Sequence, residues 1–254
     1  MSTPDSNPSG VGANASPPLR SRFLLLGSGE FLPWSADAER FVLSSATGDG
    51  SVAVLATASA KEGSAVFERW EHQGLAHFSS IGIRAQTLSV RRREDAFDPE
   101  LARRLADVSM IFFSGGKPGY LAQVLRATPL WEAIEGLLAR GGVFAGCSAG
   151  AMIAGAISGS AGYPRLPVMF RSGLGLVPAT VFGVHWDAFD KRGLRWLREI
   201  LVWRLPTSVR LIGIAEETAI AVDDLGWRVF GQGAVDVRNG AIKTFYRAPD
   251  VIPL

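Results

Sequence analysis

Cysteine and histidine are scarce in this chain of 254 residues, which has one cysteine and three scattered histidines, His72, His77 and His185. A single cysteine excludes an internal disulfide, and so few ligand side chains do not predict a structural zinc site. Long apolar runs are missing too, since none reaches the roughly 18 residues of a membrane-spanning helix. We therefore expect no metal site, no cofactor and no membrane partner.

A marked surplus of one charge is also missing. Lysine and arginine number 26 against 24 aspartates and glutamates, which gives a formal net charge of +2. The densest basic run, at residues 91–93, is followed at once by Glu94 and Asp95. That pattern is typical of a solvated loop and not of a nucleic-acid-binding patch, so we expect no nucleic-acid partner.

Hydrophobic residues make up 47% of the chain and charged residues 20%, which suits one globular domain with a large core. Residues 1–20 differ, because they are rich in Ser, Pro, Gly and Asn and contain no apolar segment. This composition is typical of a disordered tail and not of a signal peptide. We predict a disordered tail over residues 1–20, a single domain over residues 21–254 and a cytoplasmic location.

Short apolar runs alternate with helical patterns through most of the chain. The runs lie at residues 22–27, 51–58, 83–90 and 108–113 and from residue 142. The helical patterns lie at residues 35–43, around Phe67 and Trp70, and at 99–106, 120–125, 130–140 and 190–203. This alternation indicates a parallel sheet covered by helices on both faces, and therefore an α/β fold. After residue 210, strand patterns and the hairpin signal Asn239-Gly240 predict a β-rich end that completes the sheet or forms a small meander.

Residues 141–152 contain the most informative motif. Gly146, Ser148 and Gly150 form G-x-S-x-G between a strand pattern and a helix pattern, which is the composition of a nucleophile elbow. So tight a turn needs small neighbours, and it leaves the hydroxyl at the carboxyl end of the strand. A helix that begins there also directs free N–H groups toward developing negative charge. Ser148 is therefore a candidate nucleophile, although the motif alone leaves a purely structural turn open.

Two further glycine-rich segments, at residues 27–30 and 115–117, also follow predicted strands. Because the carboxyl ends of parallel strands meet at one edge of a sheet, both segments are expected close to Ser148. Of the histidines, His72 and His77 lie on or just after a predicted helix and are expected on the surface. His185 ends an apolar run, so it is a candidate general base, with a histidine in an ordinary loop as the alternative.

Four segments taken together resemble a known family. They are Phe-Ser-Gly-Gly at 113–116, Gly-Cys-Ser-Ala-Gly-Ala at 146–151, the histidine at 185 before an arginine-rich helix, and Ile-Gly-Ile-Ala-Glu-Glu-Thr-Ala at 212–219. They are similar to the cyanophycinase and aspartyl dipeptidase family of serine peptidases, over roughly residues 22–245. The resemblance implies a three-layer, flavodoxin-like fold akin to the class I glutamine amidotransferases, which carry cysteine at the elbow where this family carries serine.

The resemblance also implies roles for residues. Ser148 matches the nucleophile and His185 the general base, and the backbone N–H groups of Gly116 and Ala149 match the oxyanion hole. Such a pair needs a carboxylate to orient the imidazole, and the family's Ile-Gly-Ile-x-Glu stretch points to Glu216. Some members have an acid soon after the serine, but residues 151–184 contain none here. Asp187 and Glu217 stay open as alternatives.

Substrate preference follows less directly from the resemblance. The family usually has Asn or Asp and then Gln after the Gly-Gly turn, where this chain has Lys117 and Pro118, and the flanks of His185 differ as well. Lys117, Arg192 and Arg195 are candidates to bind a carboxylate of the substrate, since arginine recognises carboxylates bidentately. We therefore expect hydrolysis of a peptide or isopeptide bond near an acidic residue.

Two other functions stay open. The altered residues after Gly116 and around His185 favour a binding protein that keeps the fold without catalysis. A glutamine amidotransferase-like enzyme needs a cysteine nucleophile, and Cys147 stands one position before the bend, where its side chain is expected to point away from the cleft. Seven tryptophans allow a homodimer interface, although a core lined by tryptophan explains them equally well.

Overall fold

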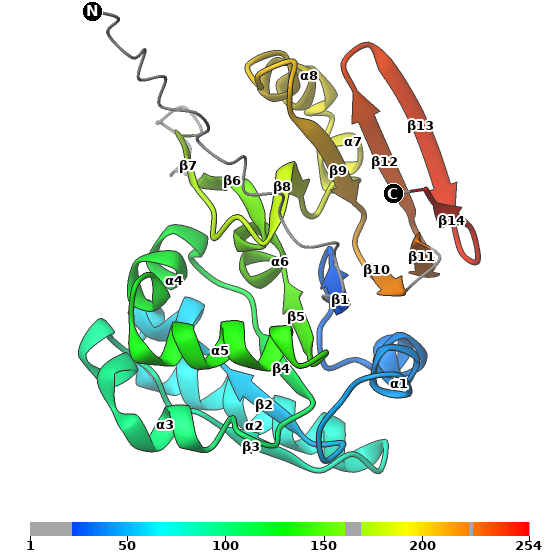
Figure 1. Cartoon of the computed structure of the whole chain (residues 1–254). Coiled ribbons are helices and arrows are strands. Elements are labelled where there is room, and N and C mark those ends of the chain that lie inside the picture. The colour runs from blue at the N-terminus through cyan, green and yellow to red at the C-terminus, as the bar shows by residue number, and fades with distance from the viewer. Residues whose placement is uncertain (1–21, 161–168, 224–225, 254) are drawn as a thin grey trace, which may run out of the picture.

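The computed structural model describes residues 22–160, 169–223 and 226–253, which form two β-sheets surrounded by helices (Figure 1). The tail predicted over residues 1–20 lies outside these ranges. The strands are β1 (Arg22–Leu26), β2 (Val52–Leu55), β3 (Ala85–Thr87), β4 (Met110–Phe113), β5 (Val143–Cys147), β6 (Gly155–Ser160), β7 (Met169–Ser172), β8 (Val177–Gly183), β9 (Arg210–Ile214), β10 (Thr218–Asp223), β11 (Gly226–Gly231), β12 (Ala234–Asn239), β13 (Ile242–Arg247) and β14 (Val251–Ile252). The α-helices are α1 (Ala36–Leu43), α2 (Ser64–Ser80), α3 (Pro99–Arg103), α4 (Pro118–Leu125), α5 (Pro129–Ala139), α6 (Ala149–Ile153), α7 (Ala188–Lys191) and α8 (Arg195–Trp203). Short 3-10 helices lie at Pro33–Ser35, Thr57–Glu62 and Arg93–Phe97.

Five parallel strands in the order β3-β2-β4-β5-β1 form the centre of the first sheet. The strands β3-β2-β4-β5 follow the flavodoxin-like order 2-1-3-4 when they are counted from β2 as the first strand. Strand β1 occupies the fifth position of that order. Beyond β1, the strands β10, β11 and β14 continue the sheet in antiparallel pairing. The predicted α/β fold with a large, mostly parallel sheet is confirmed.

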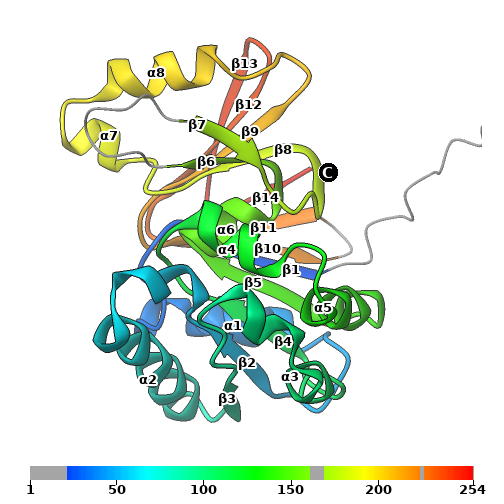
Figure 2. The same cartoon turned by 90° about the vertical axis from the view of Figure 1, so that its left-hand side faces the viewer.

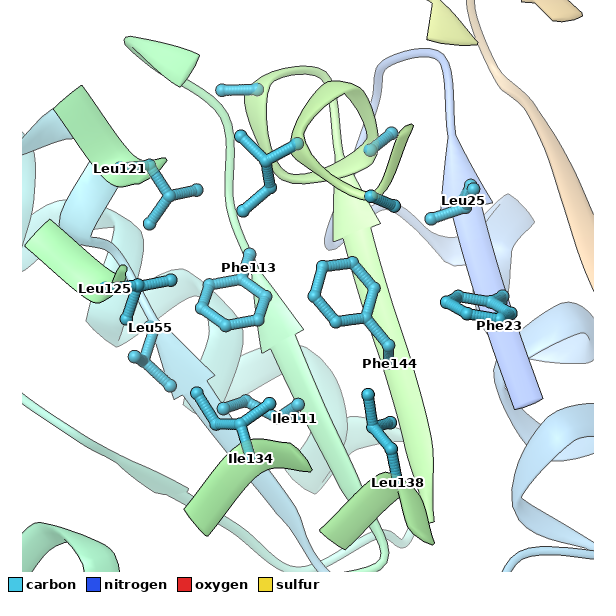
Figure 3. Close-up of a cluster of buried hydrophobic side chains, with 14 of the residues drawn as sticks. Phe23, Leu25, Leu55, Ile111, Phe113, Leu121, Leu125, Ile134, Leu138 and Phe144 are labelled. Atoms are coloured by element: carbon cyan, nitrogen blue, oxygen red, sulfur yellow. The ribbon is translucent and has the colours of Figure 1, made fainter. Parts of the chain in front are cut away.

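Helices cover both faces of this sheet because successive residues of each buried strand point to opposite sides. Phe23, Phe113 and Phe144 point to the face covered by α3 to α6, where Leu121 of α4 and Ile134 of α5 pack over them (Figure 3). The residues that alternate with them point to the other face and pack against α1 and α2. The strands are therefore buried on both sides, which explains why they are continuous apolar runs in the sequence.

The second sheet has the order β13-β12-β9-β8-β6-β7 and lies beside the first, with α7 and α8 on its outer side (Figure 2). The β-rich end predicted after residue 210 is divided between the sheets, since β10, β11 and β14 complete the first and β12 and β13 join the second. The hairpin predicted at Asn239-Gly240 is confirmed between β12 and β13.

The single helix predicted over residues 190–203 is interrupted. Gly193 has φ +69°, a left-handed conformation that ends α7 before α8 begins. Helix α8 leaves Trp196 and Trp203 exposed on its outer side, whereas Leu201 and Val202 are partly buried against the second sheet. Within the described residues, no helix has the length and apolar content needed to cross a bilayer.

The expectation that both early histidines are exposed is right for His72 and wrong for His77. The His77 side chain is buried in α2, and its Nε2 atom lies 2.6 Å from Oε2 of the buried Glu39 in α1. The hydroxyl of Ser35 donates to the other carboxylate oxygen of Glu39 at 3.0 Å. These partners satisfy polar groups that are otherwise costly to bury, so the pair joins α1 to α2.

Candidate active site

The motif at residues 146–150 forms the predicted strand–turn–helix elbow. Strand β5 ends at Cys147, Ser148 has φ +49° and ψ −107°, and α6 begins at Ala149. The Ser148 N–H donates to the Leu26 carbonyl at 3.1 Å, which fixes the bend to the end of β1. Few non-glycine residues adopt this conformation, so the surrounding contacts hold the serine in a strained position.

The two glycines of the motif are required by close packing. A Cβ on Gly146 would lie 2.4 Å from the Gly150 carbonyl carbon, and a Cβ on Gly150 would lie 2.4 Å from the Phe113 carbonyl oxygen. Both distances are shorter than any ordinary contact of a methyl group. The glycines therefore allow α6 to fold back closely over β4 and β5, with Ser148 at the turn.

His185 reaches Ser148 from the second sheet. It follows β8, its N–H donates to the Gly27 carbonyl at 3.3 Å, and its Nε2 lies 3.1 Å from Ser148 Oγ. Gly27 allows this approach, because a Cβ there would lie 2.0 Å from the Ala215 carbonyl oxygen on the turn after β9. The hydroxyl and the imidazole are thus within hydrogen-bond reach, although they come from different sheets.

Glu216 completes a chain of three side chains. It follows β9, and its Oε1 lies 3.3 Å from His185 Nδ1. The Nζ atom of Lys191 contacts the other carboxylate oxygen of Glu216 at 3.0 Å and a carboxylate oxygen of Asp187 at 2.7 Å. The hydrogen bond from Lys191 lowers the pKa of Glu216, against the opposing effect of burial, and the two carboxylates raise the pKa of Lys191 to about 12.

The two alternative acids make other contacts. Asp187 accepts from the Glu216 N–H at 2.8 Å and contacts Lys191, so it supports the turn that carries Glu216. Glu217 is exposed, and its N–H donates to the Ser28 hydroxyl at 3.4 Å. Among the described residues, Glu216 is the acid whose carboxylate contacts His185.

A buried glutamate next to the elbow was not predicted as a site residue. Glu30 accepts from the Gly115 N–H at 2.8 Å and from the Cys147 thiol at 2.9 Å. Burial, followed by the charge of Glu30, raises the pKa of Cys147 well above its ordinary value. The position of Glu30 in the glycine-rich segment after β1 was the one sequence feature that pointed to a role at the site. Its two partners are 85 and 117 residues away in the sequence, so the sequence did not reveal the contacts.

Gly115 and Gly116 bring a backbone turn against the serine. A Cβ on Gly115 would lie 3.5 Å from Ser148 Cβ, and a Cβ on Gly116, which has φ +138°, would lie 2.4 Å from the Ala58 carbonyl carbon. On the other side, Ala149 is the first residue of α6, where an N–H group has no partner within the helix. Gly116 and Ala149 therefore lie on the two elements that flank Ser148.

Two cavities meet at Ser148 and His185. The first, which we call the α8 cavity, has a volume of about 510 Å³ and extends between the second sheet and α8 past Val181, Phe182, Leu201 and Leu211. The second, which we call the acidic cavity, has a volume of about 740 Å³ and extends along α2 past Glu30, Glu62 and Trp70. Ser148 thus lines two cavities that extend in different directions.

The three predicted substrate-binding cations differ in their relation to the two cavities. Arg192, which is exposed, lines the α8 cavity. Lys117 and Arg195 are also exposed, but neither belongs to the described lining of the α8 cavity or of the acidic cavity. Within the described residues, no cluster of histidine, cysteine and acidic side chains is arranged to hold a metal ion.

A sequence profile described as Peptidase family S51 matches residues 23–230 of this chain. The chain belongs to peptidase family S51. Curated relatives include the cyanophycinase of Trichormus variabilis, which is 32% identical over 190 residues, or 68% of this chain and 60% of the relative. The cyanophycinase of Geminocystis herdmanii is 29% identical over 238 residues, or 89% of this chain and 84% of the relative. The chain thus spans 60% of the length of the first of these relatives.

Solved structures agree with the S51 assignment. A peptidase from an acI-B1 Actinobacterium superposes with a TM-score of 0.83 at 31% identity, over 92% of this chain and 97% of the other. A putative peptidase E from Listeria monocytogenes superposes with a TM-score of 0.59 at 18% identity, over 84% of this chain and 99% of the other, and at that identity it supports the fold alone. The family resemblance predicted from the sequence is confirmed, and S51 is a family of serine peptidases.

Proposed function

We propose that this chain is a serine peptidase that cleaves a peptide or isopeptide bond through an acyl-enzyme on Ser148. The contacts from Ser148 Oγ to His185 Nε2 and from His185 Nδ1 to Glu216 Oε1 support this proposal most directly. A serine hydroxyl is a weak nucleophile until a base takes its proton, and an imidazole acts as that base only when it is correctly oriented. Membership of family S51 agrees with this chemistry.

The proposed reaction has two stages. Ser148 Oγ attacks the carbonyl carbon of the substrate, and its proton passes to His185 Nε2. The N–H groups of Gly116 and Ala149 stabilise the negative oxygen of the tetrahedral intermediate, and Glu216 stabilises the imidazolium. The C–N bond then breaks and the amine leaves with the proton from His185. In the second stage, water attacks the acyl-enzyme with His185 again as the base, which releases the acid and restores the serine.

The α8 cavity offers one exposed arginine to a carboxylate of the substrate. Arg192 is the one predicted cation that lines this cavity among the described residues, and it is open to solvent. A guanidinium group binds a carboxylate with two parallel hydrogen bonds. We therefore propose that Arg192 holds an acidic group near the scissile bond, whereas Lys117 and Arg195 contribute little.

The amidotransferase-like alternative loses support from the position of Cys147. Its thiol is buried and donates to Glu30, and burial raises its pKa, so it has neither the exposure nor the ionisation that a nucleophile needs. The non-catalytic alternative differs from our proposal in one measurable property, since only an activated serine reacts with a fluorophosphonate.

Fluorophosphonate labelling and peptide hydrolysis test the proposal together. We expect Ser148→Ala to abolish labelling and to lower kcat by about 10⁶-fold, because the serine, the histidine and the acid act as a unit. Ser79→Ala, which changes an exposed serine of α2, is the matched control and is expected to behave like the unmodified chain. Equal labelling of the Ser148→Ala variant, or an unchanged rate, would refute the proposal.

A further inference from the structure

The lining of the α8 cavity is mainly apolar. Val181 of β8 and Leu211 of β9, which pair within the second sheet, form its side toward that sheet, and Leu201 and Val202 belong to α8. Leu201 and Val202 are partly exposed, so an apolar group that enters the cavity removes their accessible surface from water. This environment stabilises apolar groups and is unfavourable to polar groups without a partner.

Three titratable side chains belong to the described lining of the cavity, those of His185, Arg192 and Glu216. His185 and Glu216 contact each other beside Ser148, and Glu216 also binds Lys191. Arg192 is solvent-exposed. Apart from these three, the described lining offers no charged side chain to an acidic group. A carboxylate placed against the apolar lining residues would lose its hydration without gaining an ion pair.

The size of the cavity also limits its ligand. Its volume of about 510 Å³ lies within the range of roughly 300–1,000 Å³ that is usual for ligand pockets, so it has room for a large side chain and the adjoining backbone. A small side chain such as that of glycine or alanine would leave most of the apolar surface in contact with water.

We propose that the α8 cavity is a specificity pocket that receives a large apolar side chain, such as that of leucine, methionine or phenylalanine, from a residue next to the scissile bond. This inference rests on the proposed function, because the pocket opens beside Ser148 and His185. Any carboxylate of the same substrate is then bound by Arg192 and not by the apolar lining residues.

A peptide library tests the inference. The library contains every residue on either side of each bond, and the cleavage sites are read by mass spectrometry. We expect leucine, methionine and phenylalanine to exceed glycine and aspartate by about 10-fold or more in kcat/KM at one of the two flanking positions. Aspartate preferred to these residues at both positions, or no preference for a large apolar residue at either position, would overturn the inference.

Two neighbouring residues of α8 provide a matched pair of variants. Leu201→Trp fills the cavity and is expected to abolish the preference for large side chains while hydrolysis of small ones continues. Ile200→Trp, on the exposed side of the helix, is expected to keep the preference. An equal effect of Leu201→Trp on large and small residues would overturn the inference. Should that variant fail to fold, Leu201→Ala decides, because the larger cavity should move the preference toward phenylalanine.

Labelling of Ser148 by a fluorophosphonate separates the inference from the proposed function. Absence of labelling in the unmodified chain would refute the serine peptidase proposal, and the inference with it. Normal labelling together with a preference for acidic residues at both flanking positions, or without cleavage of any peptide that carries a large apolar residue next to the scissile bond, would refute the inference alone.

Discussion

Three residues around the active site, Ser148, His185 and Glu217, have positive φ angles although none is glycine. Each such conformation costs roughly 1–3 kcal/mol and persists only where the surrounding contacts enforce it. At Ser148 those contacts include the close packing of Gly146 against Gly150 and the hydrogen bond to Leu26. The elbow therefore stores strain in order to expose one hydroxyl.

A pair of substitutions measures this strain. Ser148→Gly and Ser148→Ala both remove the hydroxyl, but only glycine adopts φ +49° without strain. We expect the Ser148→Gly variant to have a free energy of unfolding about 1 kcal/mol higher than that of the Ser148→Ala variant. This net difference is the strain that glycine relieves, less the entropy that glycine loses on folding. Urea denaturation of both inactive variants gives the difference, and greater stability of the alanine variant would contradict the expectation.

Lys191 determines the pH at which Glu216 is protonated. Because its hydrogen bond lowers the pKa of Glu216, Lys191→Met should raise that pKa, whereas Lys191→Arg should keep it low. A carboxylate with a lowered pKa stabilises the fold above its ordinary pKa, and the effect is lost as the pH falls through the lowered value. In Lys191→Met the contribution should therefore be smaller, and its loss should be complete at a higher pH. Carboxyl ¹³C NMR titration of Glu216 provides the measurement, and identical midpoints in the two variants would rule this role out.

The site residues differ in how well the sequence predicts them. Ser148 lies in a local motif, and His185 was a candidate base because it ends an apolar run. Glu216 was assigned by resemblance to a family, since no pattern in the sequence alone joins it to His185, 31 residues away. Glu30 was missed because its importance comes from the Gly115 N–H and the Cys147 thiol, which only the folded sheet brings to it. Arg195 was predicted as a substrate-binding residue because it lies in an arginine-rich helical pattern. The break at Gly193 divides that pattern into α7 and α8, and Arg195 is the first residue of α8.

At the scale of elements, His77 and Glu39 form a buried polar contact between α1 and α2. His77→Ala leaves the Glu39 carboxylate buried without its partner, so we expect a loss of about 3–5 kcal/mol in the free energy of unfolding. His72→Ala, on the exposed side of α2, should change it by less than about 0.5 kcal/mol. Equal stability of the two variants in urea denaturation would show that the pair contributes little.

The strands and helices before residue 150 were predicted well, because each carries its own periodic pattern or continuous apolar run. The second sheet was not predicted. Strand β6 consists largely of small residues, and β12 pairs with β9 across the intervening β10 and β11. Pairings of this kind depend on contacts between distant parts of the chain, which local patterns do not encode.

At the scale of the whole molecule, the single cysteine reports on the integrity of the first sheet. Cys147 is fully buried in β5 between β1 and β4, and its pKa is raised by burial. We expect the native thiol to react with DTNB more than about 1,000-fold more slowly than the thiol of the unfolded chain, because reaction requires global opening. An exposed control, Ser79→Cys, should react rapidly. Rapid reaction of Cys147 with simultaneous loss of activity would instead favour the amidotransferase-like alternative.

Ser148 follows β5 of the first sheet, and His185 follows β8 of the second. The Gly27 carbonyl accepts from the His185 N–H, and Gly27 lies close to Ala215 on the turn between β9 and β10. Under the proposed mechanism, a compound that bound between the two sheets and separated Ser148 from His185 would stop proton transfer and leave every reacting group chemically intact. An inhibitor of the proposed activity therefore need not imitate a peptide.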